Sequence, residues 1–276
     1  MSELARSPSD RATHVGWWRQ VTATPISRAL AGILLVLVAL TVAAWVWVIQ
    51  VGAEHHSAAP TMGLGAPLFL AVWVAMMVAT MFPAVTPMVL MFARIGANKR
   101  TSGRVFVPTW LFVGGYLLVW TALGVVAYGA TVGAEALAAR VDVLARNTAI
   151  VAGILIVLAG AFQFSRLKDR CLSRCRSPLA FVMQHWQDGR LGAVRMGVHH
   201  GWHCAGCCWA LMMLMFPLGV MSVPALAGVT ALVFAEKVLP HARPVREVAG
   251  VVLVAYGLLV IADPSLLPGS PTHTHF

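Results

Sequence analysis

Six side chains that can bind a transition metal lie within one ten-residue segment of the sequence: His199, His200, His203, Cys204, Cys207 and Cys208. If this segment is an α-helix, residues three or four positions apart share a face, so several of these thiols and imidazoles can meet at one ion. Sulfur combined with imidazole nitrogen selects Cu(I) or Zn(II) rather than Mg(II) or Ca(II). The segment therefore predicts a soft-metal site, with Cu(I) ahead of Zn(II).

A second pair of thiols precedes this segment. Cys171 and Cys175 are four residues apart, a spacing that lets both occupy one face of a helix. Because one straight helix cannot surround a tetrahedral ion, we expect these thiols to complete the site, or Gly201 and Gly206 to bend the helix. The predicted ligands are Cys171, Cys175, His200, His203, Cys204, Cys207 and Cys208.

Inert packing is the alternative for each cysteine, because free cysteines are often buried in ordinary cores. All five cysteines of the chain lie between residues 171 and 208. This concentration favours metal ligation over packing.

Four methionines of an upstream apolar segment share one side of an ideal helix: Met77, Met81, Met88 and Met91. Thioethers suit Cu(I). However, Pro83 and Pro87 interrupt helical geometry in the same segment, and methionine commonly fills irregular gaps. We therefore expect these methionines to pack in a core rather than to bind metal.

Other polar groups are weaker candidates. Glu236 and Lys237 end a different apolar segment, where a helix-end anchor is favoured over a proton or ion relay. Short histidine runs outside the apolar segments are expected to be solvated rather than to collect metal; they contain His55, His56, His273 and His275.

The elements that position these residues are predicted to be membrane helices. Hydrophobic residues make up 59% of the 276 residues, and charged residues only 11%, against about one quarter in soluble proteins. A bilayer core needs roughly 20 helical residues. Seven apolar segments meet this need, which predicts an all-α, polytopic bundle of about seven transmembrane helices: 29–49, 66–93, 106–133, 148–165, 204–222, 223–239 and 247–262.

The distribution of basic residues predicts an orientation. With a cytoplasmic N-terminus, 18 of the 20 Lys and Arg residues lie on the cytoplasmic side, as the inward bias of basic residues requires. The predicted parts are a cytoplasmic segment 1–28, a transmembrane bundle 29–262 and an extracytoplasmic tail 263–276. A cytoplasmic Cys- and His-containing segment, 166–203, connects two spans, and residues 178–186 within it are predicted to form an interfacial helix.

This topology excludes two other interpretations. The net charge of +10 is spread over the connections between apolar segments, so a nucleic-acid partner is not expected. A structural disulfide is not expected either, because the thiols would face the reducing cytosol. The first apolar segment is longer than a signal-peptide core and is expected to remain as a span.

Three stretches resemble a bacterial family of predicted metal-binding integral membrane proteins, a domain of unknown function whose members are sometimes labelled copper chaperones. The first is W-x-x-M-x-x-A-T-M-F-P-x-x-x-P-M at 73–88, with Thr80 where the family usually has a methionine. The second is C-L-x-x-C-R-x-P at 171–178. The third runs from Gly197 through C-x-G-C-C-W-x-L-M at 204–212 to residues 219–221 and then Glu236 and Lys237.

The resemblance implies a bacterial inner-membrane protein that binds, carries or transports a soft metal. Its expected partners are the lipid bilayer, a metal ion and a metal-handling protein. Two alternatives stay open. One is a membrane thiol-disulfide oxidoreductase that uses Cys171 with Cys175 and Cys207 with Cys208. The other is a structural zinc staple in a protein that acts through a partner.

Overall fold

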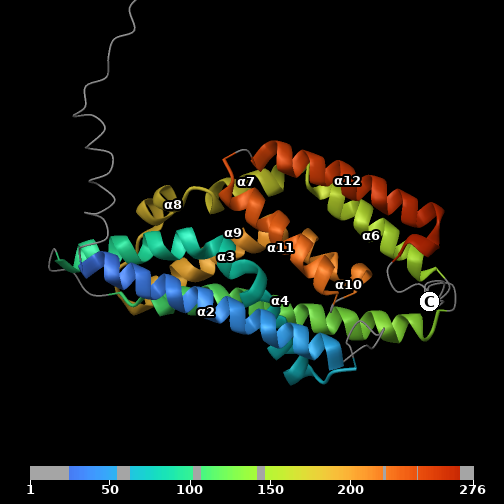
Figure 1. Ribbon diagram of the computed structural model, residues 1–276, viewed down its shortest axis with the longest axis horizontal. Helices are drawn as coiled ribbons and strands as arrows, with labels where there is room; N and C mark the ends of the chain where they lie inside the picture. The colour runs from blue at the N-terminus through green and yellow to red at the C-terminus, as the bar shows by residue number, and fades with distance from the viewer. Residues whose placement is uncertain are drawn as a thin grey trace, which may run out of the picture.

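A computed structural model describes residues 25–54, 63–101, 107–141, 147–219, 222–240 and 242–267 (Figure 1). Every regular element in these ranges is a helix, which confirms the all-α fold. The helices are α2 (Pro25–Glu54), α3 (Ala66–Thr101), α4 (Thr109–Ala138), α6 (Thr148–Phe162), α7 (Arg166–Cys175), α8 (Pro178–His185), α9 (Gly189–Met213), α10 (Met215–Leu218), α11 (Val223–Val238), α12 (Ala242–Ala262) and the 3-10 helix η1 (Pro264–Leu266).

Five of the described helices are long and apolar enough to cross a bilayer: Arg28–Ala53, Ala66–Lys99, Thr109–Ala138, Gly189–Leu218 and Ala242–Ala262. Helices α6 and α7 make a sixth if they are counted as one span with a 63° bend. Such helices are compatible with a multi-pass membrane protein. The count of seven and the cytoplasmic N-terminus stay predictions.

Neighbouring helices pack in two groups. Helix α3 lies between α2 and α4, and α4 packs along α9; α6 and α12 lie side by side on the other side of the molecule (Figure 1). Helix α11 contacts both α3 and α12, and α7 packs against α9. The cysteine-bearing helices α7 and α9 therefore meet where the two groups join.

Small residues bring α4 and α9 into close contact. A side chain at Gly197 would overlap the carbonyl oxygen of Phe112, and one at Gly115 would overlap the backbone of Val194. At Gly201 an added Cβ would lie 3.2 Å from the carbonyl oxygen of Tyr116. Glycine spaced by four residues lets membrane helices approach at backbone distance.

Helix α3 continues through its two prolines with help from α2. Proline lacks an N–H, so Pro83 cannot donate to the carbonyl of Ala79. The indole of Trp45 on α2 donates to this carbonyl at 3.1 Å. The freed backbone group is therefore satisfied inside the protein, as a bilayer requires.

The structure corrects the predicted start of the fifth span. The predicted helix begins at 204, but α9 begins at Gly189 and runs as one continuous helix through Gly201 and Gly206. The connecting segment 166–203 is largely helical: it contains α7, α8 and the first half of α9. Helix α8 forms at Pro178–His185, and its interfacial position stays a prediction. The histidines at 55, 56, 273 and 275 lie outside the described residues.

Candidate soft-metal site

Helix α9 carries its three cysteines on two adjoining faces, all of them buried. Cys204 and Cys208 are four residues apart and face α3 and α4, whereas Cys207 faces α7. Both the Cys207 and the Cys208 thiols donate to the carbonyl of Cys204, at 3.1 and 2.8 Å. Trp202, on the opposite face, is 67% exposed, which agrees with the helical arrangement inferred from the spacing.

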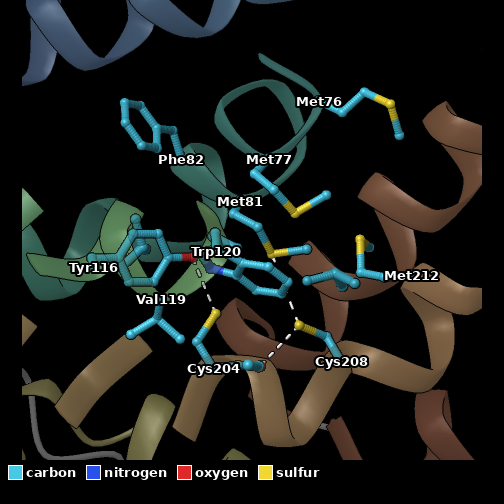
Figure 2. Packing of buried hydrophobic residues seen from close by; sticks show 14 of the residues in the cluster. Met76, Met77, Met81, Phe82, Tyr116, Val119, Trp120, Cys204, Cys208 and Met212 are labelled. Atoms are coloured by element: carbon cyan, nitrogen blue, oxygen red, sulfur yellow. Dashed lines mark hydrogen bonds between the residues drawn. The ribbon is translucent and has the colours of Figure 1, made fainter. Parts of the chain in front are cut away.

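Helix α3 contributes the thioether of Met81, which lies close to the thiol of Cys208. The sulfur of Met81 lies 4.0 Å from the sulfur of Cys208, and Met81 is fully buried. Figure 2 shows the Met81 side chain extending toward Cys208, whereas the thioether of Met76 lies far from both Cys204 and Cys208. One methionine of α3 therefore meets the thiols, although packing was expected for all of them.

The side chains of Lys237 and Tyr116 both contact the sulfur of Cys204. The ammonium of Lys237 donates to the Cys204 sulfur at 2.9 Å and lies 3.9 Å from the Met81 sulfur. The Tyr116 hydroxyl lies 3.1 Å from the same Cys204 sulfur (Figure 2). The ammonium supplies a counter-charge for a Cys204 thiolate, in a place where water is excluded.

Helix α7 brings a fourth and a fifth thiol. The sulfur of Cys175 lies 4.0 Å from that of Cys207. Cys171 packs its sulfur into the notch left by Gly206, where a Cβ would lie only 2.8 Å away. All five cysteines are free thiols. We call Met81, Cys175, Cys204, Cys207 and Cys208 the sulfur cluster.

The two predicted histidine ligands lie beside this cluster rather than in it. The ring of His200 packs against Phe112 and Tyr116, and its Nδ1 has no hydrogen-bond partner among the described residues. His203 uses both ring nitrogens: Nδ1 contacts the carbonyl of His199 at 2.8 Å, and Nε2 contacts Arg174.

Buried ion pairs hold α7 against the rest of the bundle. Lys168 is fully buried and pairs with Glu236 at 2.7 Å, and it also donates to Gln163. Arg176 donates to the main-chain carbonyl of Glu236 at 2.8 Å. Because an unpaired buried charge is costly, these contacts fix the position of Cys175 opposite Cys207.

The donor set is soft. Within the part of the chain that the structure describes, no group of three or more His, Cys, Asp or Glu residues is arranged as a metal site. The structure instead brings sulfurs together in two pairs, Cys175 with Cys207 and Met81 with Cys208, from α7, α9 and α3. Thiolate and thioether donors fit Cu(I), whereas Zn(II) prefers thiolate and imidazole.

Residues 70–260 match the family model PpoB2, which is described as a copper chaperone. The chain belongs to this family. The matched region of this PpoB2 chain contains every residue of the sulfur cluster, and it also contains Tyr116 and Lys237. No curated protein and no solved structure matches the chain.

The sequence of this PpoB2 chain does not predict a role in the site for three residues: Tyr116, Met81 and Lys237. Tyr116 carried no signal, because a tyrosine in an apolar segment is ordinary. Met81 is predicted from the sequence to pack in a core, and Lys237 is predicted to anchor the end of a helix. An ionisable residue bordering an apolar segment was the available signal for Lys237, which is only 9% exposed.

Proposed function

We propose that this PpoB2-family protein is a multi-pass membrane protein that binds Cu(I) at the sulfur cluster and carries it to or from a metal-handling partner. Copper is the cargo of the site rather than a resident cofactor. The observation that carries this proposal is the meeting of a buried thioether, Met81, with the thiols of α9 at Cys208 and Cys204. This combination of donors selects copper over the harder divalent metals.

The charge environment supports a monovalent cargo. The sulfur cluster lies beside the ammonium of Lys237, and the carboxylate of the adjacent Glu236 is paired with Lys168. A monovalent ion adds less positive charge to such a buried place than a divalent ion does. Cu(I) is therefore favoured over Zn(II), which stays the alternative cargo.

The outer surface supports a position in a membrane, and we place it in a bacterial inner membrane. Only 17% of the most apolar window of α2 is buried within the protein, and the large apolar side chains along it are exposed. An apolar surface of this extent is unfavourable in water and suits lipid. The predicted orientation has a cytoplasmic N-terminus.

Metal analysis tests the proposal. The protein purified from copper-replete cells under reducing conditions is expected to contain stoichiometric Cu(I), detected by a Cu(I)-specific chelator after denaturation. The triple variant Cys204→Ala, Cys207→Ala, Cys208→Ala is expected to lose this copper while keeping its helix content. Absence of copper from the wild-type protein, or equal copper in the variant, contradicts the proposal.

A second candidate function has one specific observation in its favour. The sulfurs of Cys175 and Cys207, on different helices, are only 4.0 Å apart, so these two thiols can pair, rather than Cys171 with Cys175 and Cys207 with Cys208. In this reaction the two thiols lose two electrons and two protons to a quinone, which becomes a quinol, and a disulfide forms. A quinone-dependent shift in thiol labelling, lost in Cys175→Ser, would favour this enzyme over the carrier.

A further inference from the structure

Three histidine rings and two thiols form a continuous row beside α9. His199, His203 and Cys207 are spaced by four residues, so their side chains follow one another along one face. His185 on α8 extends the row: its ring centroid lies 4.5 Å from that of His199, which lies 4.7 Å from that of His203. At the other end, Cys207 meets Cys175.

Main-chain carbonyls orient two of these rings. His185 Nδ1 contacts the carbonyl of Phe181 at 3.0 Å, and His203 Nδ1 contacts the carbonyl of His199 at 2.8 Å. A carbonyl only accepts, so each Nδ1 carries the proton and each Nε2 keeps its lone pair. A backbone carbonyl holds metal-binding histidines in this way in many proteins.

The row runs from the surface to the buried cluster. His185 and His199 are half-buried, His203 is 8% exposed, and Cys207 is 1% exposed. The donors also change along the row, from borderline imidazole nitrogen to soft thiol. A soft ion is therefore held more tightly at the last step, from the imidazole of His203 to the thiol of Cys207.

We propose that His185, His199 and His203 form an entry relay that passes Cu(I) from the α8 end of α9 to Cys207 in the sulfur cluster. This proposal rests on the copper-carrying function. Each step along α9 covers about 6 Å, the distance between side chains four residues apart. Arg174 contacts His203 Nε2, so this path requires the guanidinium to leave that nitrogen when the ion reaches the ring.

Loading kinetics test the relay in the full-length protein. Cu(I) supplied as its bicinchoninate complex is mixed with the reduced apoprotein, and loss of the complex colour is followed with time. His185→Leu and His199→Leu are each expected to slow loading by roughly tenfold without changing the copper bound at equilibrium. Gln184→Leu, the neighbouring position on α8, is the matched control and is expected to load like wild type.

Two results would overturn the relay in this assay. The first is an unchanged loading rate in both histidine variants. The second is a loss of equilibrium copper as large as the loss of rate, which would make the histidines ligands of the final site or structural residues.

A second measurement separates the relay from the cluster. In a variant with all five cysteines replaced by serine, and with wild-type helix content, the row is expected to bind Cu(I) weakly through nitrogen ligands seen by X-ray absorption. Addition of His199→Leu is expected to abolish this binding. If the cysteine-free protein binds no Cu(I), the relay is wrong even where the wild-type protein carries copper; if it binds and the wild type shows no sulfur ligands, the proposed function fails instead.

Discussion

Met81 and Met76 make a matched pair, because both are buried methionines of α3 and only Met81 contacts the thiols. Replacement of Met81 by leucine is expected to weaken Cu(I) binding by about 10-fold to 100-fold, since a soft donor is lost at nearly constant volume. Met76→Leu is expected to bind Cu(I) like wild type. Competition with a Cu(I) chelator measures both affinities. Equal affinities in the two variants would contradict a role for the thioether.

The same pair distinguishes the two metals. Zn(II) has little preference for thioethers, so the Zn(II) affinity of Met81→Leu is expected to equal that of wild type if the cysteines bind zinc. Titration with a zinc-responsive dye measures it. A Zn(II) loss as large as the Cu(I) loss would indicate that the substitution disturbs the cysteines rather than removes a ligand.

The buried pair of Lys168 and Glu236 makes a prediction about stability. Lys168→Met leaves the Glu236 carboxylate buried without its counter-charge, and this is expected to lower the free energy of unfolding by about 3–5 kcal/mol. Denaturant unfolding in detergent, followed by circular dichroism, measures it. The double variant Lys168→Met, Glu236→Leu is expected to recover most of the loss. A double variant as unstable as the single one would contradict the ion-pair explanation.

Residue types were predictable from the sequence, but residue partners were not. Five cysteines within residues 171–208 indicated a soft site. Which methionine faces them depends on how α3 packs on α9, a contact between segments more than 120 residues apart. Met81 shares its predicted helix face with Met77, Met88 and Met91, and only the tertiary packing shows that Met81 meets the thiols.

At the scale of elements, glycine spacing on α9 sets the contact with α4. Gly197→Ala places a Cβ against the Phe112 carbonyl and is expected to lower the free energy of unfolding by about 1–3 kcal/mol. Gly114→Ala, on α4, meets no atom within 4 Å, and alanine there is expected to be neutral or to stabilise by about 0.5–1 kcal/mol. Thermal unfolding in detergent compares them. Equal effects would show that close helix contact at Gly197 is not what the glycine provides.

The helices themselves were largely predictable, and the main error has a physical cause. Six of the seven predicted apolar segments each overlap one helix, and the seventh, 204–222, covers the second half of α9 and α10. Long apolar runs have few other stable forms in a bilayer. The first half of α9 is predicted to lie outside the spans, in the connecting segment 166–203, because Arg190, Arg195 and several histidines and glycines lower its apolar character. Arg190 and Arg195 lie exposed on the surface, and His200 is covered by α8, where the ring of Phe181 packs against it.

For the whole molecule, the number of spans determines on which side the C-terminus lies. With a cytoplasmic N-terminus, seven spans place the C-terminus outside, whereas six place it inside. The number of spans depends on whether α6 and α11 cross the bilayer, because they have only 15 and 16 residues and are short for a span. The apolar segments predict seven spans, and the basic-residue bias predicts a cytoplasmic N-terminus, so the C-terminus is expected outside. A reporter enzyme active only outside the cytosol, fused to Phe276, is expected to be active; activity only of a cytosolic reporter at that position would contradict the prediction.

The hydrogen bond from Trp45 to Ala79 has a consequence for biogenesis. If the spans enter a membrane in chain order, α2 is in place before α3, whose Ala79 carbonyl receives no helical hydrogen bond from Pro83. Lipid offers no hydrogen-bond donor for this carbonyl, and the indole N–H of Trp45 on α2 supplies one. Ala79 lies two residues before Met81, so α2, which bears none of the cysteines, supports the backbone next to the thioether of the sulfur cluster.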